Sequence, residues 1–175
     1  MNATVEREWT TAAGLPAVVL IAHASHRCGY VGVPKGHPFY GKDYDSPIPE
    51  FRSAAQSEKV GKKGVMIVFT ASCGALADGE IRPSLDVLID CHGGLTYAGV
   101  GKGYPSETVM DHWWFGFDCA HLGDGLMGPM GRHSGVGDPV RTLEFCVAEC
   151  ESIAQRIVDL CGVLSGVEPQ LEEAQ

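Results

Sequence analysis

The chain has 175 residues, enough for one domain with a sizeable core and too few for two domains of ordinary size. Its mean hydropathy is near zero and 45% of its residues are hydrophobic, which excludes a disordered chain, and no apolar run is long enough for a transmembrane helix. A net charge of −9 argues against duplex nucleic acid as a partner, because binding to a duplex depends on neutralising phosphates.

The first residues contain neither the basic segment nor the apolar segment of a signal peptide, so we predict a cytoplasmic protein. The seven cysteines are an odd number, and no two of them form a C-x-x-C pair. In the reducing cytosol we expect free thiols, most of them acting as small buried apolar residues.

Two strands are predicted near the N-terminus, at 16–24 and 28–34, where β-branched residues are dense. A turn over 23–27 would join them as a hairpin. The next stretch, 34–50, holds four prolines and two glycines and is therefore predicted to be a loop.

The middle of the chain gives weaker patterns. A short amphipathic helix is predicted over 51–60, followed by a solvated lysine cluster at Lys59, Lys62 and Lys63. The Gly-Gly pair in 92-HGG-94 predicts a hairpin turn or bulge, because glycine has the backbone freedom that a tight turn needs. Four further segments are predicted as strands: 65–71, 85–91, 95–99 and 113–119.

A long glycine-rich loop and a helix end the chain. The stretch 122–139 has six glycines and no periodicity, which is typical of a lid or a binding loop. Apolar residues then recur at spacings of three and four over 140–164, which predicts an amphipathic helix. We expect Asp138 to cap this helix, with Pro139 at its first position and Gly166 after its end.

These elements together predict an α+β fold. It has a mainly antiparallel sheet of about five to six strands, with the long C-terminal helix packed on one face. We expect one domain over 1–167 and a frayed acidic tail over 168–175.

The candidate catalytic residues are Asp118, His121, Asp124 and His92. The first three can converge only if the strand ends near Asp118 and the chain then turns, because residues three apart on a strand face opposite ways. Imidazoles oriented by carboxylates perform general acid–base catalysis, and the same four residues could hold a divalent metal. The alternative is structural: Asp118 caps a turn, His121 is a half-buried histidine and Asp124 solvates a loop. A Cys2His2 zinc site that adds Cys91 and Cys119 lacks the usual spacing.

The loop over 34–45 is a candidate nucleotide-binding segment, because its cations suit phosphates and its rings suit a base. It lacks the spacing of a P-loop or a dinucleotide fold, and the alternative is a proline-rich loop held by its own aromatic residues. Adjacent tryptophans at 113 and 114 face opposite sides of their strand, so one of them could line a pocket. The predicted ligand-binding residues are Tyr30, Lys35, His37, Tyr40, Lys42, Tyr44, Gly93, Gly94, Thr96, Trp114 and Arg132.

Four phrases of the sequence resemble a family of small bacteriophage proteins, mainly from phages of actinobacteria. They are 26-HRCGYVGVPKGHPFYGKDYD-45, 92-HGGLTYAG-99, 113-WWFGFDCAHLGD-124 and 149-ECESIAQRI-157. The segment 51–84 departs from the family pattern and has the look of an insertion. The resemblance implies a context, since phage accessory proteins of this size often act on host physiology, including host defence. It would place the protein in the host cytosol.

We therefore expect a pocket that binds a nucleotide-derived small molecule, such as a cyclic oligonucleotide or a cyclic ADP-ribose type of immune signal, and inactivates it by hydrolysis. One alternative is a sponge that holds the signal without cleaving it, in a pocket shared within a homodimer or higher oligomer. Another is a module that contacts a host protein and binds no ligand.

Overall fold

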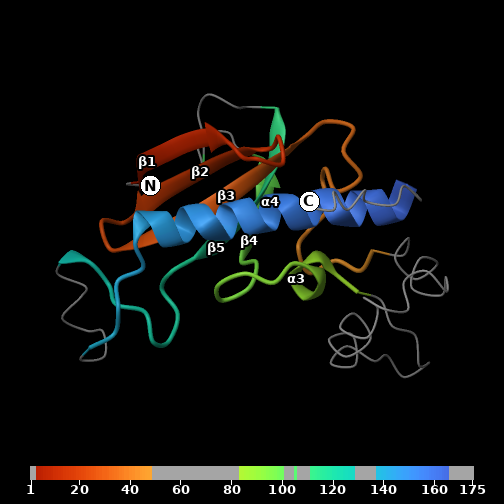
Figure 1. Ribbon diagram of the computed structural model, residues 1–175. Coiled ribbons are helices and arrows are strands. Elements are labelled where there is room, and N and C mark those ends of the chain that lie inside the picture. Colours follow the sequence, from red (N-terminus) through yellow and green to blue (C-terminus); the bar gives the residue numbers. More distant parts are fainter. Residues whose placement is uncertain (1–2, 49–82, 101–104, 106–110, 129–136, 166–175) are drawn as a thin grey trace, which may run out of the picture.

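The computed structural model describes residues 3–48, 83–100, 105, 111–128 and 137–165 (Figure 1). Its elements are β1 (Ala3–Thr10), β2 (Pro16–Ala22), β3 (His26–Pro34), α3 (Leu85–Leu88), β4 (Tyr97–Val100), β5 (His112–Asp118) and α4 (Leu143–Ser165). Several predicted features lie outside the described residues: the 51–60 helix, the lysine cluster, the 65–71 strand, Arg132 and the 168–175 tail. None of the helices in the described ranges has the length and apolar character needed to cross a membrane.

The five strands form one antiparallel sheet in the order β1-β2-β3-β5-β4. The first three follow one another as a meander, and β5 then pairs with β3, which leaves β4 at the outer edge. In the β2–β3 turn, Ser25 N donates to Ala22 O over 3.0 Å. Between them, His23 and Ala24 have positive φ angles of 52° and 54°, a conformation that residues other than glycine and asparagine rarely adopt. The expected hairpin is thus confirmed.

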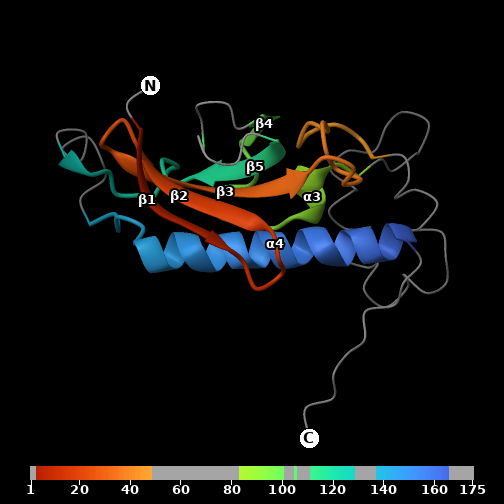
Figure 2. The same ribbon diagram turned by 90° about the horizontal axis from the view of Figure 1, so that it is seen from above.

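Figure 2 shows α4 running along one face of the sheet, which confirms the predicted α+β architecture. The helix comes close to β3 at Gly29, where an added Cβ would lie 2.8 Å from Cys150 Sγ and 2.7 Å from Phe117 Cζ. Each fully buried isoleucine or leucine in this interface contributes roughly 1.5–3 kcal/mol. The buried residues of α4 are Cys146, Cys150, Ile153, Ala154, Ile157 and Leu160.

The opposite face of the sheet carries a second cluster. Trp114 is fully buried there with Val18, Leu20 and Tyr30, and Tyr97 packs against the cluster. The neighbouring Trp113 belongs to the helix face. The predicted alternation of the two tryptophans is therefore confirmed, and both rings serve packing.

Two predictions of local structure are wrong, and one strand was not predicted. The segment 85–91 is not a strand: it begins with the short helix α3, whose Leu85 and Leu88 are buried. A short apolar run fits either kind of element, and here tertiary burial decides. The turn at 92–94 is therefore not a hairpin between strands. β1 was not predicted because its residues are mostly exposed and largely charged or polar.

The start of α4 also differs from the prediction. The helix begins at Leu143, so Asp138 and Pro139 lie outside it. Thr142 acts as the cap, since its Oγ1 accepts a hydrogen bond from Phe145 N over 3.2 Å. Pro139 O instead accepts from Gly125 N over 2.9 Å, which ties the approach to α4 to the segment that follows β5.

Candidate metal and catalytic site

The turn after β5 brings the predicted residues together. β5 ends at Asp118, and Asp118 Oδ1 accepts a hydrogen bond from Ala120 N over 3.0 Å. The chain then closes a second turn in which Asp124 N donates to His121 O over 3.0 Å, with Gly123 at a φ of 91°. The strand therefore ends at Asp118 and the chain turns, as the convergence of Asp118, His121 and Asp124 requires.

A separate turn supplies His92. Gly94 N donates to Cys91 O over 3.0 Å, and the positive φ angles of Gly93 (70°) and Gly94 (82°) suit glycine. Helix α4 then fixes the position of His92, because Glu149 Oε2 accepts from its backbone N over 2.7 Å. The imidazole also stands edge-on to Phe145, with ring centroids 5.4 Å apart.

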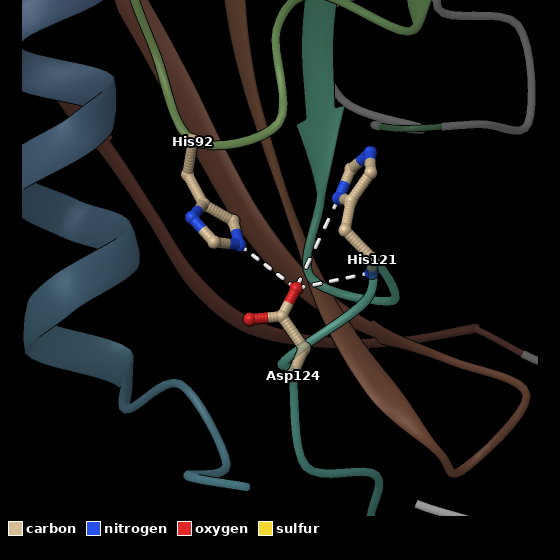
Figure 3. A group of neighbouring side chains, drawn as sticks. All are labelled: His92, His121 and Asp124. Carbon is tan, nitrogen blue, oxygen red and sulfur yellow. Dashed lines mark hydrogen bonds and ion pairs between the residues drawn. The ribbon is translucent and has the colours of Figure 1, made fainter. Parts of the chain in front are cut away.

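Figure 3 shows His92 and His121 on either side of the Asp124 carboxylate. Asp124 Oδ2 lies 2.8 Å from His92 Nε2 and accepts from His121 N over 3.0 Å. The other oxygen, Oδ1, accepts from Arg141 Nε over 2.8 Å. The Asp124 side chain is only 1% exposed, so its charge depends on these partners.

The ionised form of Asp124 is favoured by its hydrogen bonds. Burial alone would raise the pKa of this carboxyl, but the donors His92, Arg141 and the His121 backbone outweigh burial and lower the pKa below its ordinary value. Arg141 is itself held in place, since its guanidinium lies 5.1 Å from the centre of the Phe145 ring. The carboxylate is therefore negative and fixed at neutral pH.

His121 Nδ1 is buried and has no hydrogen-bond partner among the described residues. It lies 3.7 Å from Asp118 Oδ1 and 3.9 Å from Asp124 Oδ2, which is too far for a hydrogen bond. A divalent ion between this nitrogen and the Asp124 carboxylate would be bound by both. Space for this ring depends on Gly93, where an added Cβ would lie 2.6 Å from His121 Nε2.

The donor set fits a divalent metal. One ligand atom from each of His92, His121 and Asp124 lies within 4.8 Å of the others, and no other such group of His, Cys, Asp and Glu occurs among the described residues. Two imidazoles and one carboxylate form a set that catalytic zinc sites use. Arg141 on the second oxygen of Asp124 would orient that ligand. The Cys2His2 alternative is not formed, because Cys119 is buried against Cys146.

The 34–45 loop does not belong to this site. Antiparallel pairing puts Cys28 opposite Asp118 and Pro34 opposite His112, so the loop starts at the far end of β3. At about 3.3 Å per residue that end is about 20 Å from Asp118. The sequence led us to expect one pocket built from the 34–45 loop and the turn after β5, and the chain does not form it.

The side chains of this loop serve local structure. Tyr40 and Tyr44 pack against the core, and Lys42 O accepts a hydrogen bond from Trp113 Nε1 over 2.8 Å. His37 Nε2 lies 3.3 Å from Cys161 Sγ near the end of α4. Lys35 forms an exposed ion pair with Asp111. This matches the alternative of a loop held by its own aromatic residues.

The remaining predicted ligand residues divide between the site and the core. Thr96 belongs to the site, since its Oγ1 donates to Asp118 Oδ2 over 3.0 Å, and so does Gly93, which lies against the His121 ring. Gly94 only completes the turn, since an added Cβ there would have nothing within 4 Å. Tyr30 and Trp114 are buried in the second cluster, on the face away from α4.

Sequence reasoning missed three residues that complete the site. Arg141 and Glu149 hold Asp124 and His92, but they are 17 and 57 residues away from them, and no spacing rule links them. His26, at the start of β3, is the third. Burial lowers the pKa of His26, and the charge of nearby Asp118 opposes this shift. His26 is the first residue of the phrase HRCGYVG, but the sequence analysis used this phrase only for the family resemblance.

Comparison of the chain with protein-family models, with curated proteins and with solved structures found no match.

Proposed function

We propose that the protein is a metal-dependent hydrolase, with His92, His121 and Asp124 as metal ligands. The observation that carries this proposal is the convergence of His92, His121 and Asp124, whose ligand atoms lie within 4.8 Å of one another. The buried Nδ1 of His121 lies near the carboxylates of Asp118 and Asp124 and has no hydrogen-bond partner among the described residues.

The roles of the residues follow from their partners. A divalent ion bound by the three ligands would supply a water of lowered pKa and would polarise the bond to be cleaved. Asp118 is the candidate general base, because it is 30% exposed beside His121 and both of its oxygens are held, by Thr96 and by the backbone of Ala120. Arg141 and Glu149 position two of the ligands.

The proposed substrate is a nucleotide-derived small molecule with a phosphodiester or related bond, such as a cyclic oligonucleotide or cyclic ADP-ribose type of immune signal. Support comes from the resemblance to phage proteins, which implies an action on host physiology, and from the suitability of a metal centre for phosphoester cleavage. The 34–45 loop gives no support, because its rings and cations are used in packing and in an ion pair.

The test compares two histidine variants. His121→Asn removes a ligand, whereas His112→Asn removes an imidazole at the other end of β5, with its Nδ1 also buried and unpartnered among the described residues. Each protein is stripped with EDTA and titrated with Zn²⁺ and Mn²⁺. It is then incubated with cyclic di- and trinucleotides and cyclic ADP-ribose isomers, and the products are identified by mass spectrometry.

We expect metal binding and turnover in the wild type and in His112→Asn, and loss of both in His121→Asn. If the protein binds metal and also binds a nucleotide that is released intact on heating, the function is sequestration and not hydrolysis. Equal metal affinity in the wild type and both variants would refute the proposed metal centre. If none of the nucleotides is bound or cleaved, a host-protein partner becomes the favoured function.

A further inference from the structure

Two buried cysteines lie side by side beneath the site. Cys119 directly follows β5, and Cys146 lies in the first turn of α4. Their sulfur atoms are 3.7 Å apart, although the residues are 27 apart in the sequence. Cys119 is 2% exposed and Cys146 is fully buried. No step of the proposed hydrolysis uses either thiol.

The surroundings of Cys146 favour its thiolate. The contact with Cys119 lowers the pKa of Cys146, and burial opposes this shift. The positive charge of Arg27 lowers the pKa of Cys146 further, against the opposing charges of Glu6 and Glu149. Arg27 also fixes Cys119, because its backbone oxygen accepts from Cys119 N over 2.9 Å. A neighbouring cation favours the thiolate, which is the form of cysteine that reacts with peroxide.

We propose that Cys119 and Cys146 form a redox modification site, at which hydrogen peroxide converts the two thiols to a disulfide between the end of β5 and the first turn of α4. This inference does not depend on the proposed hydrolase activity. A pair of this kind suits a reducing compartment, where protein disulfides are mostly transient and regulatory.

The chemistry balances in two steps. The Cys146 thiolate attacks one oxygen of the peroxide and the O–O bond breaks, which leaves a sulfenic acid on Cys146 and a hydroxide that takes up a proton to become water. The sulfur of Cys119 then attacks the sulfur of Cys146 and the S–O bond breaks. The departing hydroxide takes the proton of Cys119 and leaves as a second water. Two electrons pass from the sulfurs to the peroxide.

Formation of the disulfide requires the sulfur atoms to approach from 3.7 Å to about 2.05 Å. Because both thiols are buried, access for a small oxidant requires local opening of the first turn of α4. The disulfide would link the two elements that carry the site, since His121 lies two residues after Cys119 and Phe145 directly precedes Cys146.

Cys150 provides a matched control. It is also fully buried, one turn farther along α4, but its sulfur lies at Gly29 and bonds to the backbone of Tyr30. Burial raises its pKa, so it lacks the thiolate character of Cys146. Cys150→Ala therefore removes a buried thiol from the same helix without touching the proposed pair.

The experiment treats the purified full-length chain with hydrogen peroxide under native conditions, blocks the remaining thiols, and maps the peptides without reduction. We expect a Cys119–Cys146 crosslink and a rise in Tm of roughly 10 °C, both reversed by dithiothreitol. Cys150→Ala should keep both effects and Cys146→Ala should lose both. Cys119→Ala serves as the second test if Cys146→Ala does not fold. A native protein in which peroxide yields no Cys119–Cys146 crosslink would overturn the proposal, and so would a Tm rise that persists in Cys146→Ala.

Discussion

Replacement of Gly93 by alanine tests whether the position of His121 matters to the site. An added Cβ would lie 2.6 Å from His121 Nε2 and closer still to Cε1 and Nδ1, whereas ordinary contact begins at 3.4 Å. The His121 ring must therefore move by roughly 1 Å, but metal ligand distances tolerate only about 0.2 Å.

Two effects on free energy are expected from Gly93→Ala. The φ angle of 70° costs an alanine about 1 kcal/mol of folding stability. Displacement of one of three ligands should weaken metal binding about 100-fold, which is about 2.7 kcal/mol in binding free energy. The first effect belongs to the backbone and the second to the imidazole, so the two can be separated.

Gly94→Ala is the matched control. Its φ angle of 82° imposes the same kind of backbone strain, but an added Cβ there has nothing within 4 Å. Zn²⁺ affinity is measured for both variants by competition with a chromogenic chelator, and stability by urea unfolding of the metal-free proteins. We expect similar losses of stability and a loss of affinity confined to Gly93→Ala. Equal Zn²⁺ affinities in the two variants would show that the reasoning about His121 is wrong.

Two further predictions concern stability. Asp124→Asn should destabilise the protein by about 2 kcal/mol at pH 7. The wild-type carboxyl has a lowered pKa in the folded state, so its contribution is present above its unfolded pKa of about 3.9 and is lost as the pH falls through the folded value. Urea titrations should therefore show a smaller gap between the two proteins at pH 3 than at pH 7, and a constant gap would contradict this account. Thr142→Ala should cost about 1 kcal/mol through loss of the α4 cap, measured by thermal unfolding, whereas Asp138→Ala should have little effect if Thr142 is the true cap.

The sequence predicted those elements whose apolar pattern matches their burial. β2, β3, β5 and α4 bury regular sets of residues, so their patterns were clear. In β1 only the Trp9 ring is large and packs against the core, and most other residues are exposed. β1 is therefore a strand because it pairs with β2, and not because its sequence has an apolar alternation. The strand predicted at 85–91 failed for the opposite reason, since its leucines are buried as a helical turn.

The candidate site could be predicted in part, because local rules govern one half of it. Glycines and the end of a strand indicated that Asp118, His121 and Asp124 could converge, and the Gly-Gly turn singled out His92. The 34–45 loop was assigned to the same pocket because its cations and rings suit a nucleotide and because it follows a strand. Which end of the sheet it occupies depends on the register between β3 and β5, and no short-range pattern encodes that register.

The position of β5 between β3 and β4 has a consequence for synthesis. β1, β2 and β3 can pair as soon as they leave the ribosome, but the partner of the β3 edge comes much later, as the 76-residue separation of Lys35 and Asp111 shows. At 5–20 residues per second the nascent meander keeps an open edge for about 4–15 seconds. During that time neighbouring nascent chains can pair with β3 in place of β5. Closely spaced ribosomes on one messenger should thus favour strand exchange between copies, and sparse initiation should favour pairing of β3 with β5 of the same chain.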